Sequence, residues 1–69
     1  MIRINKVKAR KCYNEGKSFT IVACKMRPKF GIIFRPTWKE QFRDFDAMVN
    51  NFEYYNCNNE TGRYAAYYI

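Results

Sequence analysis

Few residues in this chain of 69 amino acids have side chains that could carry out catalysis. The chain has no histidine, so a cysteine nucleophile would need another activating base or a strongly lowered pKa, and only nearby lysines could supply either. Asp44 and Asp46 form a closely spaced carboxylate pair, but positions i and i+2 of a helix point about 200° apart and cannot share a substrate. The sequence therefore predicts that the protein is not an enzyme and has no catalytic residues.

The three cysteines do not have the spacing of a metal site. Cys12, Cys24 and Cys57 are separated by 11 and 32 intervening residues, and no histidine is available to complete a zinc-binding set. An odd number of widely spaced cysteines also argues against a secreted disulfide framework and for a reducing cytosol. We therefore expect three free thiols, no metal and no cofactor.

Basic side chains are concentrated in the first half of the chain. Residues 1–35 contain ten lysines and arginines against a single acid, Glu15, whereas residues 36–69 contain three against five acids. The first half therefore has a net charge of +9 and the second half of −2, which gives the +7 of the whole chain. A field of one sign on one part of a small domain attracts polyanions, so nucleic acid, or a protein surface that normally holds it, is the first partner to consider.

Several of these basic residues lie in or beside a predicted hairpin in the middle of the chain. Its cations are Lys25, Arg27, Lys29 and Arg35, and Phe30 lies among them. Cations that neutralise phosphates, next to a ring that stacks on a base, are what binding of single-stranded nucleic acid or RNA requires. We predict that these five residues bind nucleic acid; the alternative is a solvated hairpin tip with Phe30 in the core. Further positive charge comes from Lys6, Lys8, Arg10, Lys11 and Lys17, which would encircle a helix.

Tyrosines are frequent towards the end of the sequence. Tyr64, Tyr67 and Tyr68 fall in a predicted strand, where alternation sends Tyr64 and Tyr68 to one face of the sheet and Tyr67 to the other. A tyrosine can bury its ring and keep its hydroxyl in water, which suits both sheet packing and protein interfaces. We predict that at least one ring is exposed and that these three residues form a protein-binding surface, with a structural role as the alternative.

The clearest element that could position such side chains is a helix over residues 38–53. Its large apolar side chains fall within one sector of about 120°, and its charged and amide side chains fall outside that sector. The members of this stripe are Trp38, Phe42, Phe45, Met48, Val49 and Phe52. Thr37 followed by Glu40 has the spacing of a capping box and predicts the start of the helix, whereas Asp44 or Asp46 would cap a shorter helix.

Three segments have the patterns of β-strands. Residues 18–26 are apolar on both faces, which is typical of a central strand, and residues 30–34 form its hairpin partner. Residues 63–69 form a third strand after a polar turn. The sequence thus predicts a single small α+β domain over residues 1–69, with a three-stranded antiparallel sheet packed with two helices in the order α-β-β-α-β.

The first element of this order has two interpretations. Ile2 and Ile4 alternate as they would in a strand. Asn5, a run of charged helix formers and Gly16 instead have the positions expected for a capped helix. We favour the helix for residues 1–15.

The sequence contains no signal for a membrane or for secretion. No apolar run approaches the ~18 residues of a membrane span, and no apolar segment follows the basic N-terminal residues as in a signal peptide. With the reducing compartment inferred from the cysteines, this predicts a soluble cytoplasmic protein without a membrane partner.

Two stretches carry a resemblance to known proteins. They are FDAMVNNFEYYNCNNETGRYAAYYI at residues 45–69 and EGKSFTIVACKMRP at residues 15–28. Both resemble small uncharacterised proteins encoded by bacteriophages and integrated mobile elements. That family has no assigned activity, so the resemblance implies an accessory or host-directed protein that works by stoichiometric binding in a bacterial host cell, and it assigns no site residues.

These observations favour one function and leave two alternatives. We expect a non-enzymatic accessory protein of phage type that uses its basic hairpin against nucleic acid or a nucleic-acid-handling complex. The first alternative is a stoichiometric inhibitor of a host defence protein, of the anti-restriction or anti-CRISPR type, that binds through the tyrosine-rich end. The second alternative is a structural or oligomer-forming virion component.

Overall fold

The chain folds into a small α+β structure with a core between two helices and one sheet. The computed structural model describes residues 1–24, 27, 29, 31–57 and 64–69. In chain order the elements are β1 (Arg3–Ile4), α1 (Lys6–Glu15), β2 (Thr20–Ala23), β3 (Ile32–Ile33), the 3-10 helix η2 (Pro36–Glu40), α2 (Phe45–Asn56) and β4 (Ala65–Tyr68). The α+β class with two α-helices is confirmed within these residues.

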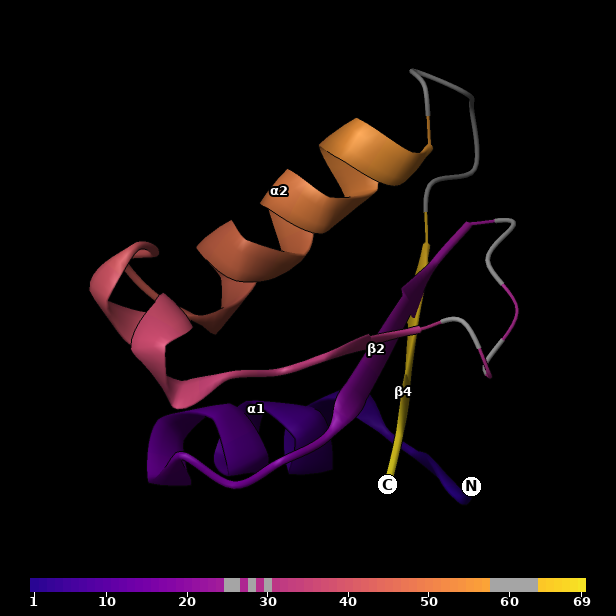
Figure 1. The fold of residues 1–69 in the computed structure, drawn as a ribbon, viewed down its shortest axis with the longest axis horizontal. Coiled ribbons are helices and arrows are strands. Elements are labelled where there is room, and N and C mark those ends of the chain that lie inside the picture. The colour runs from indigo at the N-terminus through magenta and orange to yellow at the C-terminus, as the bar shows by residue number, and fades with distance from the viewer. Residues whose placement is uncertain (25–26, 28, 30, 58–63) are drawn as a thin grey trace.

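The strands form one antiparallel sheet in the order β1-β4-β2-β3. Four strands, rather than the predicted three, are present in the described part of the chain, and the additional one is β1. Ile2 and Ile69 exchange both backbone hydrogen bonds, at 2.7 and 2.8 Å, so the two ends of the chain lie side by side (Figure 1). Residues 1–15 contain a short strand followed by a helix, so both patterns in that segment are real and the error was to treat them as alternatives.

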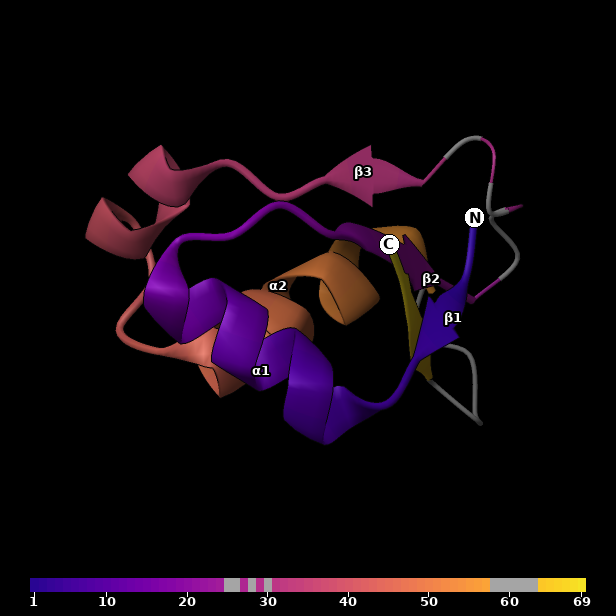
Figure 2. The same cartoon turned by 90° about the horizontal axis from the view of Figure 1, so that it is seen from below.

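Both α-helices lie against the same face of the sheet (Figure 2). Phe19, Ile21 and Tyr67 point to this face and pack with buried side chains of α1 and α2. Strand β2 lies between β4 and β3, and all four of its residues are buried, which confirms the prediction of a central strand with two apolar faces. Its hairpin partner β3 is shorter than predicted.

Local signals at both ends of α1 explain why the helix forms there. The side chain of Asn5 accepts a hydrogen bond from the backbone N–H of Lys8 at 2.8 Å and so satisfies one of the unpaired N-terminal amides. Gly16 ends the helix with φ at 71°, a left-handed conformation that glycine adopts without a steric penalty. Both caps are those expected from the sequence.

Helix α2 begins seven residues later than predicted, because Asp44 and not Thr37 caps it. Asp44 is extended, and its carboxylate accepts a hydrogen bond from the backbone N–H of Ala47 at 2.8 Å. The segment Pro36–Glu40 forms the separate 3-10 turn η2, and no side chain caps its start. The apolar stripe is divided accordingly, with Phe45 fully buried in α2 and Trp38 packed on the core from η2.

Neither α1 nor α2 is long and apolar enough to cross a membrane, and the same holds for every helix in the described part of the chain.

Candidate nucleic-acid interface

The structure divides the basic residues that were predicted to bind nucleic acid. Arg27, Lys29 and Arg35 are exposed, while Lys25 and Phe30 lie outside the described residues. Arg35 follows β3, whereas Arg27 and Lys29 precede that strand. The three described residues are therefore not one patch along the sheet.

Arg35 lies instead at the end of the sheet where β2 begins. The backbone N–H of Phe34 donates to the carbonyl of Phe19 at 2.8 Å, which places Arg35 next to Ser18 in the antiparallel ladder. Ser18 itself lines a pocket of about 320 Å³ between α1 and the sheet. Arg35 therefore adds positive charge beside this pocket.

Three lysines converge on the same pocket. Lys8 and Lys11 are three residues apart on α1, so they lie on one side of the helix, and Lys17 comes from the segment that leads into β2. Glu15 is the acidic side chain that lines the pocket, and it forms an ion pair with Lys17 at 3.5 Å. We call Lys8, Lys11, Lys17 and Arg35 the basic end of the molecule.

Two other basic residues of α1 are engaged with α2. Lys6 and Arg10 both lie close to the carboxylate of Asp46, at 3.7 and 3.3 Å. The guanidinium of Arg10 also lies over the ring of Phe45, 5.4 Å from its centroid. The basic residues of α1 thus encircle the helix as expected. Lys6 and Arg10 contact α2, whereas Lys8 and Lys11 face solvent at the pocket.

Much of the remaining positive charge is uncompensated. Among the residues that the structure describes, five basic side chains on the first half of the chain make no ion pair. These are Arg3, Lys8, Lys11, Arg27 and Arg35. A polyanion could approach any of them without first displacing an internal carboxylate.

The tyrosines occupy three different environments. Tyr64 is 53 % exposed and donates a hydrogen bond from its hydroxyl to the carbonyl of Cys24 at 2.5 Å. Tyr68 is partly buried, whereas Tyr67 is only 5 % exposed and packs on Phe45 with ring centroids 5.6 Å apart. The prediction of at least one exposed ring is confirmed by Tyr64, and the ring of Tyr67 belongs to the core.

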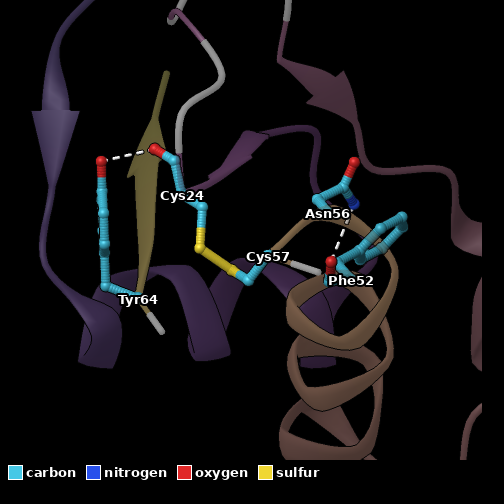
Figure 3. The surroundings of a disulfide bond; sticks show 5 residues. All are labelled: Cys24, Phe52, Asn56, Cys57 and Tyr64. Carbon is cyan, nitrogen blue, oxygen red and sulfur yellow. Dashed lines mark hydrogen bonds between the residues drawn. A yellow bond between two sulfur atoms is a disulfide. The ribbon is translucent and has the colours of Figure 1, made fainter. Parts of the chain in front are cut away.

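The prediction of three free thiols is wrong. Cys24 and Cys57 form a disulfide that joins the end of β2 to the end of α2, with Cα atoms 5.5 Å apart (Figure 3). Both residues are buried with Ala23 in a small apolar cluster, where the end of α2 meets the end of β2. Sequence spacing gave no sign of the pair, since 33 positions separate the two cysteines.

Cys24 is held in an unusual backbone conformation at this corner. Its φ angle is 53°, in the left-handed region that costs a non-glycine residue about 1–2 kcal/mol. The disulfide fixes its side chain, and the hydroxyl of Tyr64 binds its carbonyl (Figure 3).

Cys12 remains a free, buried thiol beside the lysine pocket. Within the described residues no three histidine, cysteine or carboxylate side chains come together as metal ligands.

A second and larger cavity, of about 740 Å³, lies at the opposite end of α1. It is a cleft between the start of α1, helix α2 and one edge of β4. Its lining side chains include Arg3, Lys6, Glu53 and Tyr67. Sequence analysis missed this cleft, because it depends on where β1 stops pairing with β4.

No protein-family model, curated protein or solved structure matches the chain.

Proposed function

We propose that the chain is a non-enzymatic binding protein that engages nucleic acid, or a complex that handles nucleic acid, through its basic surface. The observation that carries this proposal is the convergence of three lysines on one pocket, with Arg35 at the ladder position next to Ser18 and Glu15 as the acid among the lining residues. Lysine is a compact point charge that neutralises phosphate without demanding one geometry, which suits binding along a sugar-phosphate backbone.

The exposed hairpin residues Arg27 and Lys29 form a second contact region in this proposal. They lie at the other end of β3, so a nucleic-acid chain that touches both regions would follow the length of that strand. Lys6 and Arg10 are assigned a structural role, because their charges are already directed at Asp46. The proposal therefore separates cations that bind a partner from cations that hold the fold.

The proposed biological role is that of a phage-type accessory protein; the cytoplasmic location expected from free thiols loses that support, because Cys24 and Cys57 are paired in a disulfide. Stoichiometric binding by a charged surface requires no catalytic residue and can be performed by a domain of this size. Binding of a polyanion in this role is supported by Lys8, Lys11 and Arg35, which make no ion pair among the described residues.

Fluorescence anisotropy at several salt concentrations tests the proposal with labelled single-stranded and double-stranded oligonucleotides. In the variant Lys8→Gln/Lys11→Gln each lost phosphate contact should lower the log–log salt slope by about 0.7 for single strands and 0.9 for duplex. The matched control is Lys39→Gln/Arg43→Gln, which removes two charges from the segment between β3 and α2 and should change the slope much less. A third variant, Arg27→Gln/Lys29→Gln, measures how much these two hairpin residues contribute to oligonucleotide binding and to its salt slope.

Thermal melting of each variant establishes that it is folded before its affinity is compared. Failure of the parent protein to bind any oligonucleotide at low salt would contradict the proposal. Equal losses in the lysine variant and in its matched control would show that net charge, and not the basic end, determines binding.

A further inference from the structure

The large cleft is bordered by a stretch of β4 whose edge has no strand beside it among the described residues. The N–H of Cys24 donates to the carbonyl of Tyr64 at 3.1 Å, so the backbone groups of Tyr64 face β2. Backbone groups alternate between the two sides of a strand, so those of Ala66, two residues later, also face β2. On the other side, the Ile2–Ile69 exchange directs the backbone groups of Tyr67 towards β1. The next residue in that series is Ala65.

The N–H and carbonyl of Ala65 therefore face the position that a continued β1 would fill. Strand β1 ends at Ile4, because Asn5 caps α1 and the chain turns away from the sheet. Ala65 and the start of α1 both line the cleft, and no backbone hydrogen bond joins Ala65 to β1 or α1 in the described part of the chain. An unpaired edge of this kind is a template for one more short strand.

Charged and polar residues line the cleft beside this edge of β4. Arg3 lines the cleft and has no ion pair among the described residues, and Lys6 lies beside it at the start of α1. Tyr67 is more than nine-tenths buried, and its hydroxyl makes no hydrogen bond within the described chain. Glu53 lines the α2 side of the cleft, so the basic side chains lie on the β1 and α1 side.

We propose that this cleft binds an extended peptide segment of a partner protein, and that the segment carries an acidic side chain. The peptide backbone adds to the edge of β4 by exchanging hydrogen bonds with Ala65, and its carboxylate binds Arg3. Nucleic acid has no alternating N–H and C=O groups to offer this edge, so the geometry selects a polypeptide. The exposed ring of Tyr64 lines the rim and adds apolar contact.

This inference is independent of the proposed nucleic-acid surface, because the two sites share no residue. The lysine pocket is lined by the middle and end of α1, and the cleft by residues before and at its start. The variant Lys8→Gln/Lys11→Gln should therefore leave peptide binding unchanged.

The test uses isotopically labelled protein and NMR titration with two capped pentapeptides, Thr-Val-Glu-Val-Thr and Thr-Val-Lys-Val-Thr. The glutamate peptide should shift the Ala65 amide resonance in a saturable way, and the lysine peptide should bind at least about tenfold more weakly. A glutamate peptide N-methylated at its central residues cannot donate to the edge and should lose binding. Arg3→Gln should weaken the glutamate peptide about fivefold, while the exposed-arginine control Arg27→Gln should not.

Three outcomes would overturn the inference. One is the absence of any shift at Ala65 with either peptide, and another is binding that survives both N-methylation and Arg3→Gln. The third is a shift of the same cleft resonances by an oligonucleotide, or by raising the protein concentration alone, without a response to the peptides. A shift caused by the oligonucleotide would assign the cleft to nucleic acid, and a shift caused by protein concentration alone would assign it to a further copy of this chain.

Discussion

Helices α1 and α2 lie against the same face of the sheet, but they contribute differently to the molecule (Figure 2). Helix α2 buries Phe45, Met48 and Val49 and ends at Cys57, which is covalently joined to β2. Helix α1 buries Ala9, Cys12 and Tyr13 and exposes lysines along its outer side. The comparison indicates that α2 contributes the larger apolar side chains and a covalent link to the sheet, whereas the outer surface of α1 presents lysines to solvent.

The largest expected effect is the loss of a core ring on α2. Phe45 is 1 % exposed and contacts Tyr13, Phe19 and Tyr67, so Phe45→Ala should lower the free energy of unfolding by about 3–5 kcal/mol. Urea denaturation followed by circular dichroism measures this change. Val7→Ala on α1, where the side chain is 71 % exposed, is the control and should change stability by less than about 0.5 kcal/mol. Equal midpoints for the two variants would refute the assignment of the core to α2.

The covalent link at the end of α2 should have the next largest effect. Reduction, or the substitution Cys24→Ser/Cys57→Ser, should cost about 2–4 kcal/mol, because the crosslink closes a long loop in the unfolded chain. Thiol titration in denaturant should find one reactive group before reduction, Cys12, and three after it.

The control is Cys12→Ser, which leaves the disulfide intact and removes the thiol of α1. Three reactive groups in protein that has never been reduced would show that the two thiols do not pair, and would restore the expectation drawn from sequence spacing.

Local signals made much of this fold predictable. Asn5 and Gly16 cap α1 as expected, because a cap depends on hydrogen bonds to residues three or four positions away. The start of α2 was misplaced because Thr37 and Asp44 both have cap chemistry, and only packing of η2 on the core distinguishes them.

Features that depend on distant parts of the chain were not predictable in the same way. The disulfide depends on where α2 ends relative to β2, and the cleft depends on where β1 stops pairing with β4. The predicted hairpin site was divided for the same reason, since Arg27 precedes β3 and Arg35 follows it, next to Ser18 at the start of β2. Sequence pattern identified the relevant residue types, but the sheet register decides which of them share a surface.

The caps of the two helices should respond differently to acid. The hydrogen bond from the N–H of Ala47, followed by the charge of Arg43, lowers the pKa of Asp44 below its usual value. A lowered pKa stabilises the fold above the unfolded value of about 3.9, and this contribution is lost as the pH falls through that value to the folded pKa. Asn5, the cap of α1, does not titrate.

Urea midpoints measured between pH 5 and pH 2 should therefore fall more steeply for the parent protein than for Asp44→Asn, which keeps a capping oxygen without a charge. Substitution of Asn5 by Ser should leave the acid dependence of the parent unchanged. Parallel pH profiles for the parent and Asp44→Asn would contradict the assigned role of this carboxylate.

The smallest effect on the free energy of unfolding is expected for Tyr13, the aromatic residue of α1 whose ring packs in the core. Tyr13 packs edge-on against Phe45, but its hydroxyl is buried without a hydrogen-bond partner within the described residues, and burial raises its pKa. Removing an unsatisfied buried hydroxyl while keeping the ring is close to neutral or stabilising, so Tyr13→Phe should change the free energy of unfolding by no more than about 0.5 kcal/mol or should increase it. Urea denaturation of this variant beside Phe45→Ala measures the difference between the two helices directly. A loss of more than about 1 kcal/mol would show that the hydroxyl is hydrogen-bonded in solution, and that α1 anchors the core more firmly than its exposed surface indicates.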